Sequence, residues 1–568
     1  MKIGRNVHQH FLKDELQAQT DEFKKILETS AIDLLLEKNT VFVAMFIKFM
    51  DNGEMLLKFN SSRPLPRRND YFYCFTLPKS LSRYKDWGNL SYGDLIKRET
   101  KATEIKCIWH DKTEDPRFML AGFKGASEEF KQYVEKAPGG IVTLGPQVPP
   151  YEYLANLQKV AHSYNPKCNK ILDSDYSNKE WRPALLNSTN NLTERVINDF
   201  INTDIVILQG PPGTGKTYRI SSLCEFLCDA NKSVLVTALT NRALMEVAKK
   251  LKNSKLLTNK RISKTNLTTD ELKEVPGIQS SDKVQAMPGN LMLSTFYISS
   301  GTAANNYEGP LFDYVIVDEA SQAFLPMLAA ANMLGHKNLW VGDVNQMPPI
   351  VLVSKDRVNR LGYAPTIDGL NTVTSSCQYI TYQLSDTFRL GTRGASFTGL
   401  FYNNTLTSKS ELNGLFDKED GPVIIPLNMP LGDPMPNIAV REAVSLAKQL
   451  LSKNKKVEIA ILSQLIKTTK AIQSEVTSQI GSSNNILVET VARVQGITKD
   501  YTIFLIPDTD SKLHSLELRL FNVATSRARR NTYIICPSNI LAFSYMSPIV
   551  RKYLENAFNN YRNYGTSD

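Results

Sequence analysis

The spacing of hydrophobic positions changes several times along the chain, and each change predicts a different kind of element. Residues 7–37 carry apolar side chains at helical spacing among lysines and acids, which predicts a long amphipathic helix. Residues 41–125 hold about five short apolar runs separated by turn signals, and these predict a small antiparallel barrel. A second helical pattern begins after Pro150, and we expect it to pack against the first helix as a stalk.

Beyond residue 180 the pattern becomes an alternation of buried strands and helices. Such an alternation predicts a parallel, doubly wound α/β sheet. Residues 252–290 are polar and rich in lysine, so we interpret them as an insertion outside the core. The alternation restarts beyond residue 376, which predicts a second α/β core. The expected domains are therefore a stalk with a strand-rich accessory domain, a first core and a second core with a C-terminal tail, over residues 1–175, 176–375 and 376–568.

Composition agrees with a multidomain protein. The chain has 568 residues, of which 42% are hydrophobic, and its apolar runs are broken or too short to span a bilayer. We therefore expect a cytoplasmic protein, or a nuclear one in a eukaryote, with no membrane partner. A net charge of +10 permits a polyanionic partner without requiring one. Of seven scattered cysteines, Cys224 and Cys228 lie one helical turn apart, and buried thiols explain this pair better than a metal site does.

The most informative stretch is residues 207–217, which reads as a strand, a glycine-rich loop and the start of a helix. Glycines in such a loop let consecutive N–H groups turn toward a phosphate. The Lys216 ammonium would lie against the β- and γ-phosphates of a nucleotide, and the Thr217 hydroxyl would bind Mg²⁺. A glycine-rich turn with an incidental lysine is disfavoured by the strand–loop–helix setting. The predicted nucleotide-binding residues of this loop are Gly210, Pro211, Pro212, Gly213, Thr214, Gly215, Lys216, Thr217 and Tyr218.

Polar residues at the ends of later strands complete the predicted site. Asp318 and Glu319 follow a buried apolar run, so both carboxylates should emerge at the carboxyl edge of a parallel sheet. Asp318 would hold Mg²⁺ through water, and Glu319 would orient or deprotonate the attacking water. Gln346 follows another strand and would sense the γ-phosphate. Arg389 and Arg527 lie in the predicted second core. If both arginines reach across, ATP binds in the cleft between the cores.

These residues together carry a resemblance to superfamily 1 helicases. The family's motifs occur in order and spacing as GPPGTGKT, VTALTNRA, VDEASQA, VGDVNQMPP, DTFRL, ETVARVQGITKD and NVATSRARR. DEAS with GDVNQMPP resembles the branch that includes the nonsense-mediated-decay RNA helicase and senataxin. The resemblance covers residues 180–540 and implies two tandem RecA-like cores that use ATP and Mg²⁺. The helices and strands before residue 180 resemble the stalk and accessory barrel of that branch.

The resemblance also assigns roles residue by residue. Lys216, Glu319, Gln346, Arg389 and Arg527 would act in hydrolysis, with Arg389 and Arg527 as arginine fingers. Phe388 would stack on the nucleotide base and Gly496 would belong to the nucleotide site. The residues implied to contact nucleic acid are Thr240, Asn241, Thr295 and Gln495.

Three positions depart from the family pattern. Asn190 stands where the family has an adenine-reading glutamine, which predicts tolerance of other bases. Thr498 replaces an acidic residue of the fifth motif, and this puts sugar recognition in doubt. No Cys/His-rich regulatory module precedes the core in this sequence, so the protein partners of the branch's best-known member are not carried over.

The expected function is an ATP-dependent translocase and helicase on single-stranded RNA or DNA, moving 5′ to 3′ by resemblance. The alternative is a nucleic-acid-stimulated ATPase switch that clamps or remodels nucleoprotein without unwinding. A P-loop kinase or metabolic enzyme is disfavoured because neither needs a second α/β core with two patterned arginines. RNA and DNA are not distinguished, since both offer phosphates to grip and bases to stack.

Overall fold

The computed structural model describes residues 4–68, 70–176, 180–306, 308–416, 421–481, 485–510 and 512–565. Its internal contacts divide the chain into two compact units. One unit comprises Met1–Glu15, Tyr151–Glu475 and Asn485–Asp568, and the other comprises Leu16–Pro150 and Val476–Asn484. Within the described ranges, no helix is both long enough and apolar enough to cross a membrane.

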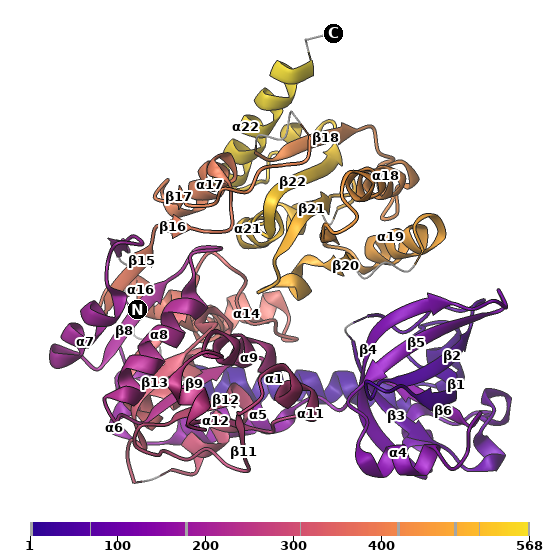
Figure 1. The fold of residues 1–568 in the computed structure, drawn as a ribbon, viewed down its shortest axis with the longest axis horizontal. Helices are drawn as coiled ribbons and strands as arrows, with labels where there is room; N and C mark the ends of the chain where they lie inside the picture. Colours follow the sequence, from indigo (N-terminus) through magenta and orange to yellow (C-terminus); the bar gives the residue numbers. More distant parts are fainter. Residues whose placement is uncertain are drawn as a thin grey trace. The chain divides into compact units, whose positions relative to one another are not determined.

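The smaller unit contains a closed antiparallel barrel in the order β1-β2-β5-β4-β3-β6 (Figure 1). Its strands are β1 (Phe42–Phe49), β2 (Met55–Asn60), β3 (Tyr71–Thr76), β4 (Lys101–Lys112), β5 (Phe118–Lys124) and β6 (Ile141–Gly145). The barrel prediction is confirmed. The sixth strand was not predicted, because β6 is only five residues long and follows the helix α4 (Glu128–Val134). It closes the barrel by pairing with both β1 and β3.

The first sheet of the larger unit has nine parallel strands in the order β11-β10-β12-β9-β13-β14-β8-β15-β7. They are β7 (Ala184–Leu186), β8 (Ile205–Gln209), β9 (Val234–Ala238), β10 (Ile262–Thr265), β11 (Gln279–Ser281), β12 (Leu291–Thr295), β13 (Phe312–Val317), β14 (Gly335–Gly342) and β15 (Ile380–Leu384). The predicted insertion at 252–290 thus supplies two edge strands. Its apolar residues, including Ile262 and Ile278, join the main hydrophobic cluster.

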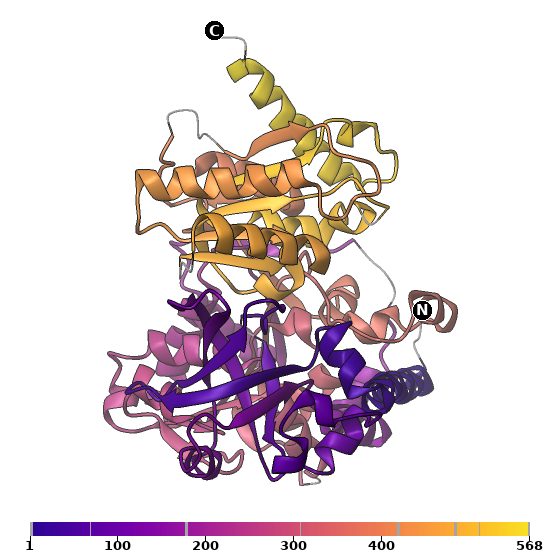
Figure 2. The ribbon, with the colours of Figure 1, turned by 90° about the vertical axis from the view of Figure 1, so that its right-hand side faces the viewer.

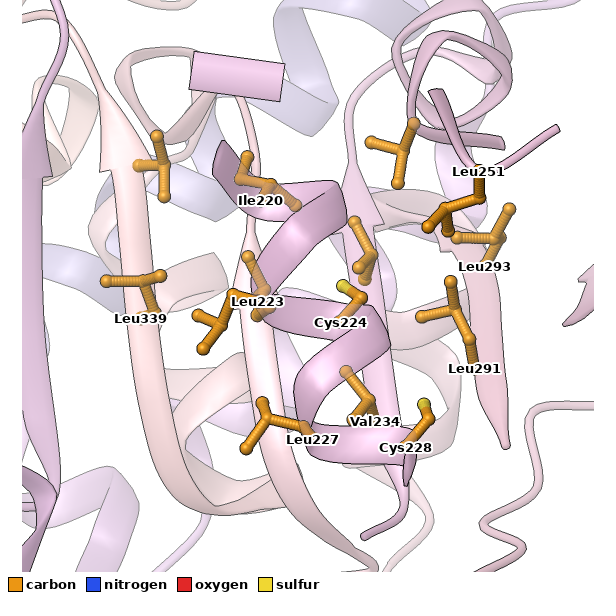
Figure 3. Close-up of a cluster of buried hydrophobic side chains, with 14 of the residues drawn as sticks. Ile220, Leu223, Cys224, Leu227, Cys228, Val234, Leu251, Leu291, Leu293 and Leu339 are labelled. Atoms are coloured by element: carbon orange, nitrogen blue, oxygen red, sulfur yellow. The ribbon is translucent and has the colours of Figure 1, made fainter. Parts of the chain in front are cut away.

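Helices cover this sheet through apolar faces. They include α7 (Leu192–Asn202), α8 (Lys216–Asp229), α9 (Asn241–Lys250), α12 (Phe296–Ala304) and α13 (Leu325–Leu334). Figure 3 shows α8 turning Leu223, Cys224 and Cys228 toward the strands. Both thiols are fully buried, and no metal-binding group of three His, Cys, Asp or Glu side chains exists among the residues that the structure describes.

The second sheet has five parallel strands in the order β18-β22-β21-β19-β20. They are β18 (Val423–Leu427), β19 (Ile459–Ser463), β20 (Ile486–Thr490), β21 (Lys499–Leu505) and β22 (Ala528–Pro537). Figures 1 and 2 agree in placing α18 (Asn437–Lys453) on one face of this sheet. The helix α21 (Leu518–Thr525) leads into β22. The expected boundary at 376 differs from the structure, because β15 pairs with β8 in the first sheet. The sequence pattern of a strand does not show which of two sheets the strand joins.

The predicted helix over 7–37 is observed as α1 (Arg5–Glu28) and α2 (Ala31–Leu36), separated where Ser30 caps α2. The helical pattern after Pro150 forms α5 (Tyr151–His162) and α6 (Pro166–Leu172). These helices pack against α12 and α13 respectively. The start of α1 belongs to the same unit, where the buried His8 ring meets the carbonyl of Leu172 at 3.3 Å. The stalk itself stays a prediction.

Candidate nucleotide site

The glycine-rich loop joins β8 to α8, as its sequence predicts. Gly213 and Gly215 adopt φ angles of 75° and 79°, a left-handed conformation that side chains disfavour. Lys216 begins α8, and its ammonium donates hydrogen bonds to the carbonyl oxygens of Gly210 and Pro211. Burial lowers the pKa of Lys216, although Asp343 and Asp318 oppose that effect. The loop thus brings a cation to a helix N-terminus, a suitable setting for phosphate.

Asp318 and Glu319 follow β13 at the carboxyl edge of the first sheet. Asp318 is buried and accepts a hydrogen bond from the Glu319 backbone N–H at 2.9 Å. Burial raises the pKa of Asp318. Burial, together with the neighbouring Asp318 charge, raises the pKa of Glu319 to about 7. A carboxyl group with a pKa near neutrality suits proton transfer at physiological pH.

Asp343 organises the end of the adjacent strand β14. Its Oδ1 accepts hydrogen bonds from Gln209 Nε2 at 2.7 Å and from the Asn345 N–H at 3.1 Å. Its Oδ2 accepts from Gln346 Nε2 at 2.8 Å and from Tyr402 Oη at 2.7 Å. All four partners donate, which is the arrangement an ionised carboxylate accepts. Asp343 therefore holds Gln346 close to the end of β8, the strand that leads into the glycine-rich loop.

The two predicted arginines come together within the larger unit. Arg389 Nη1 donates to the carbonyl of Ser526 at 3.1 Å, and Ser526 directly precedes Arg527. The pKa of Arg389 falls to about 9 through burial and the nearby charge of Arg527. Burial lowers the pKa of Arg527 to about 10, and the charges of Asp343 and Glu319 are among the interactions that counter this. Both guanidinium groups remain cationic at neutral pH.

The motif DTFRL, which contains Arg389, also makes hydrogen bonds to the glycine-rich loop. The Phe388 N–H donates to the Gly213 carbonyl at 2.8 Å, and Thr387 Oγ1 donates to the Pro212 carbonyl at 2.9 Å. The Phe388 ring is 51% exposed and Tyr218 is 64% exposed, so both rings are open to a ligand. Asn190 Oδ1 accepts from the Asn187 N–H at 2.9 Å. The side-chain oxygen of Asn190, which stands at the position of the family's adenine-reading glutamine, therefore already accepts a hydrogen bond within its own turn.

The predicted nucleic-acid residues lie at the start of α9, at the end of β12 and after the turn that follows β20. Thr240 is exposed and caps α9 by accepting from the Ala243 N–H, and Asn241 is exposed at the first position of that helix. Thr295 ends β12 and is buried. Gln495 Oε1 accepts from Gln322 Nε2 at 3.0 Å. A Cβ at Gly496 would lie 3.4 Å from Glu319 Oε1, so the fifth motif adjoins the carboxylate pair.

Several residues of the site were not predicted. They are Gln209, Gln322, Asn345, Tyr402 and Asn522. Gln209 directly precedes GPPGTGKT, and Gln322 and Asn345 lie inside VDEASQA and VGDVNQMPP, so their place in the motifs is the signal that could have singled them out. Tyr402 lies in an apolar stretch, whereas Asn522 is the first residue of the motif NVATSRARR. Their polarity is visible in the sequence, but their partner Asp343 is not.

The donor set fits Mg²⁺. Magnesium in nucleotide sites takes one or two carboxylates, a hydroxyl and substrate phosphates, so a cluster of three protein acids is not needed. Thr217, in the first turn of α8, would supply a hydroxyl, and Asp318, directly after β13, would supply a carboxylate.

Comparison with known proteins finds similarity within the segment that forms the first sheet. Residues 193–352 match the family model described as an AAA domain. The DNA replication ATP-dependent helicase/nuclease DNA2 of Saccharomyces cerevisiae is 31% identical over 163 residues, covering 28% of this chain and 10% of that protein. Human DNA2 is 31% identical over 158 residues, covering 27% of this chain and 15% of that protein. JHS1 of Arabidopsis thaliana is 26% identical over 193 residues, covering 32% and 14%.

The matched segments thus span at most 15% of these three relatives. They support the prediction of a superfamily 1 helicase that hydrolyses ATP, but they do not single out the DEAS branch. Among solved structures, an Arterivirus nonstructural protein 10 helicase with DNA has a TM-score of 0.37 at 15% identity, covering 63% of this chain and 65% of that one. The DEAD-box helicase Mss116 has a TM-score of 0.35 at 13% identity, covering 61% and 70%.

Proposed function

We propose that this protein is an ATP-dependent helicase or translocase that moves along single-stranded nucleic acid. The observation that carries the proposal is the convergence of Lys216, Glu319, Gln346, Arg389 and Arg527 around one glycine-rich loop. A phosphate-binding loop alone occurs in many enzymes. Two arginines from beyond the first sheet, the partly buried Arg389 and the buried Arg527, interact electrostatically with Lys216, and arginine charge at such a loop suits stabilisation of a transferring phosphoryl group.

Each residue has a distinct proposed task in hydrolysis. The loop N–H groups and Lys216 bind the β- and γ-phosphates, and Lys216 exchanges its carbonyl contacts for phosphate oxygens. Glu319 orients the attacking water and takes its proton, for which a pKa of about 7 is suited. Arg389 and Arg527 stabilise the charge that develops on the transferring phosphoryl group. Mg²⁺, held by Thr217 and Asp318, supplies electrostatic stabilisation of the phosphate oxygens when bound.

The proposed binding of nucleic acid rests on exposed polar residues that follow β9 and on the net positive charge of the chain. Thr240 and Asn241 are exposed at an α-helix N-terminus, which suits a backbone phosphate. We further propose the arrangement of two RecA-like cores with a stalk, membership of the DEAS branch and 5′-to-3′ movement. The names of the matched relatives make DNA the first polymer to test, with RNA beside it. The alternative function is a stimulated ATPase switch that clamps or remodels nucleoprotein.

The deciding experiment is strand displacement with matched RNA and DNA duplexes carrying 5′ or 3′ single-stranded tails. We expect ATPase activity to rise with single strands of any sequence and displacement to occur from one tail polarity. Binding should weaken with salt at a log–log slope of about −0.7 per phosphate contacted. Lys216→Ala should abolish hydrolysis, whereas Glu319→Gln should bind ATP and nucleic acid without turnover. Stimulated hydrolysis without displacement would favour the switch, and normal turnover by Glu319→Gln would refute the assigned chemistry.

A further inference from the structure

Tyr402 connects the two sheets of the larger unit through its hydroxyl group. It ends the short helix η4 (Leu400–Tyr402), which lies in the chain between the two sheets, and its side chain is 2% exposed. Its Oη donates to Asp343 Oδ2 at 2.7 Å and accepts from Asn522 Nδ2 at 2.9 Å. Asn522 lies on α21, which ends two residues before Arg527. One phenol therefore joins the loop that carries Gln346 to the helix that leads to Arg527.

The same contacts fix the orientation of Gln346. Asp343 is 1% exposed, and each of its oxygens accepts two hydrogen bonds. Burial and the Asp343 charge hold the pKa of Tyr402 well above its ordinary value, so the phenol keeps its proton and donates. Because Asp343 only accepts, Gln346 must turn its Nε2 toward it. With Nε2 committed to Asp343, the other end of the Gln346 amide presents Oε1, which is an acceptor.

We propose that Tyr402 is a positioning residue for ATP hydrolysis. Its hydroxyl holds the Asp343 carboxylate in the orientation that aims Gln346 Oε1 at the attacking water, and it ties this orientation to α21. The inference rests on the proposed ATPase function and assigns Tyr402 no contact with ATP. Removing the hydroxyl should therefore slow turnover and leave ATP affinity nearly unchanged.

Tyr402→Phe is a clean test because it orphans no other buried donor. Asn522 Nδ2 keeps its hydrogen bond to the Asn345 carbonyl at 2.8 Å, and Asp343 keeps three donors. Tyr553→Phe is the matched control. It removes the same group from a fully buried tyrosine that packs against Phe401 in the same cluster, and it touches none of the four Asp343 hydrogen bonds.

The experiment compares kcat and KM for ATP, at saturating single strand, in wild type, Tyr402→Phe, Gln346→Ala, the double variant and Tyr553→Phe. We expect Tyr402→Phe to lower kcat about tenfold with KM within about twofold, and the double variant to match Gln346→Ala within about twofold. Asn522→Ala, which removes the donor that orients the Tyr402 hydroxyl, should shift kcat in the same direction. A wild-type kcat in Tyr402→Phe, or a full additional loss in the double variant, would overturn the inference. A wild-type protein without ATPase activity would overturn the proposed function and this inference with it.

Discussion

Gly213 packs directly against Arg389. A Cβ at position 213 would lie 2.4 Å from Arg389 Cβ and 2.7 Å from Thr387 Oγ1. Neither distance occurs between real atoms of this kind. The tip of the phosphate-binding loop and the segment with the first arginine are therefore built as one packed element. Any residue larger than glycine at 213 must displace one of them.

Gly213→Ala should consequently impair both nucleotide binding and turnover. The new methyl group adds a steric clash to the strain of a left-handed φ of 75°. Gly215→Ala is the matched control, since φ is 79° there but no atom lies within 4 Å of the added Cβ. The control should cost about 1–2 kcal/mol of stability through strain alone. Thermal unfolding and binding of a fluorescent ATP analogue would measure both variants. Equal effects at 213 and 215 would show that contact with Arg389 is unimportant.

The pH dependence of hydrolysis should report Glu319. The ionised carboxylate is the form that accepts a proton, and its pKa in the free enzyme is raised to about 7. We therefore expect kcat/KM for ATP to rise about tenfold per pH unit below pH 7 and to level off above it. ATP binding by Glu319→Gln, measured over the same pH range, corrects for titration of the nucleotide. A profile in wild type that stays flat between pH 5.5 and 8 would assign the base to another group.

The two arginines should act on the rate more than on affinity. Arg389→Ala and Arg527→Ala should each lower kcat by about 10²-fold, because arginine charge is used most in the transition state. Arg527→Ala should also reduce stability, since its buried Nε donates to the Val523 carbonyl at 2.9 Å. Arg530→Ala, whose guanidinium donates to the Asn413 carbonyl at 2.6 Å, is the control from the same basic cluster. Rates near wild type in both finger variants would remove these arginines from the site.

Base selectivity should be weak. Asn190 is one methylene shorter than the family's glutamine, and its Oδ1 already accepts from the Asn187 N–H. Loss of one bidentate contact is worth about 1–3 kcal/mol, by analogy with base readout in DNA, so GTP should be hydrolysed within about tenfold of ATP. Asn190→Gln should increase the preference for ATP. A wild-type preference above about a hundredfold would point to another adenine-reading group, and the ratio of kcat/KM for the two nucleotides measures it.

Features set by neighbouring residues could be predicted from the sequence, whereas features set by contacts between distant parts of the chain could not. The glycine-rich loop and the Asp318-Glu319 pair were predictable because each is a local pattern at the end of an apolar run. The barrel was predictable from strand spacing, although the short β6 was not. The assignment of β15 to the first sheet was not predictable, since a strand's partner is set by packing far away in the chain. The same holds for residues 262–281, whose polar surroundings hide two edge strands.

Contacts of long sequence separation explain what was missed in the site. The hydrogen bond between Tyr402 and Asp343 joins residues 59 positions apart, and that between Asn522 and Asn345 joins residues 177 apart. Asp343, Asn345 and Asn522 lie within the helicase-like motifs and Tyr402 does not, but no local pattern shows which of these residues contact one another. A buried polar side chain must find a partner, so such residues are informative only once the fold brings the partner near.

Glu319 has a backbone φ of 53° and ψ of 38°, in the left-handed region that non-glycine residues seldom adopt. It also carries a carboxyl group with a raised pKa, whose ionisation destabilises the folded state as pH rises from its unfolded value of 4.5 through about 7. Both effects oppose folding at neutral pH. Glu319→Gly and Glu319→Gln should therefore melt at higher temperature than wild type while losing turnover. Stability and the proposed role of Glu319 in hydrolysis therefore place opposite demands on this one residue.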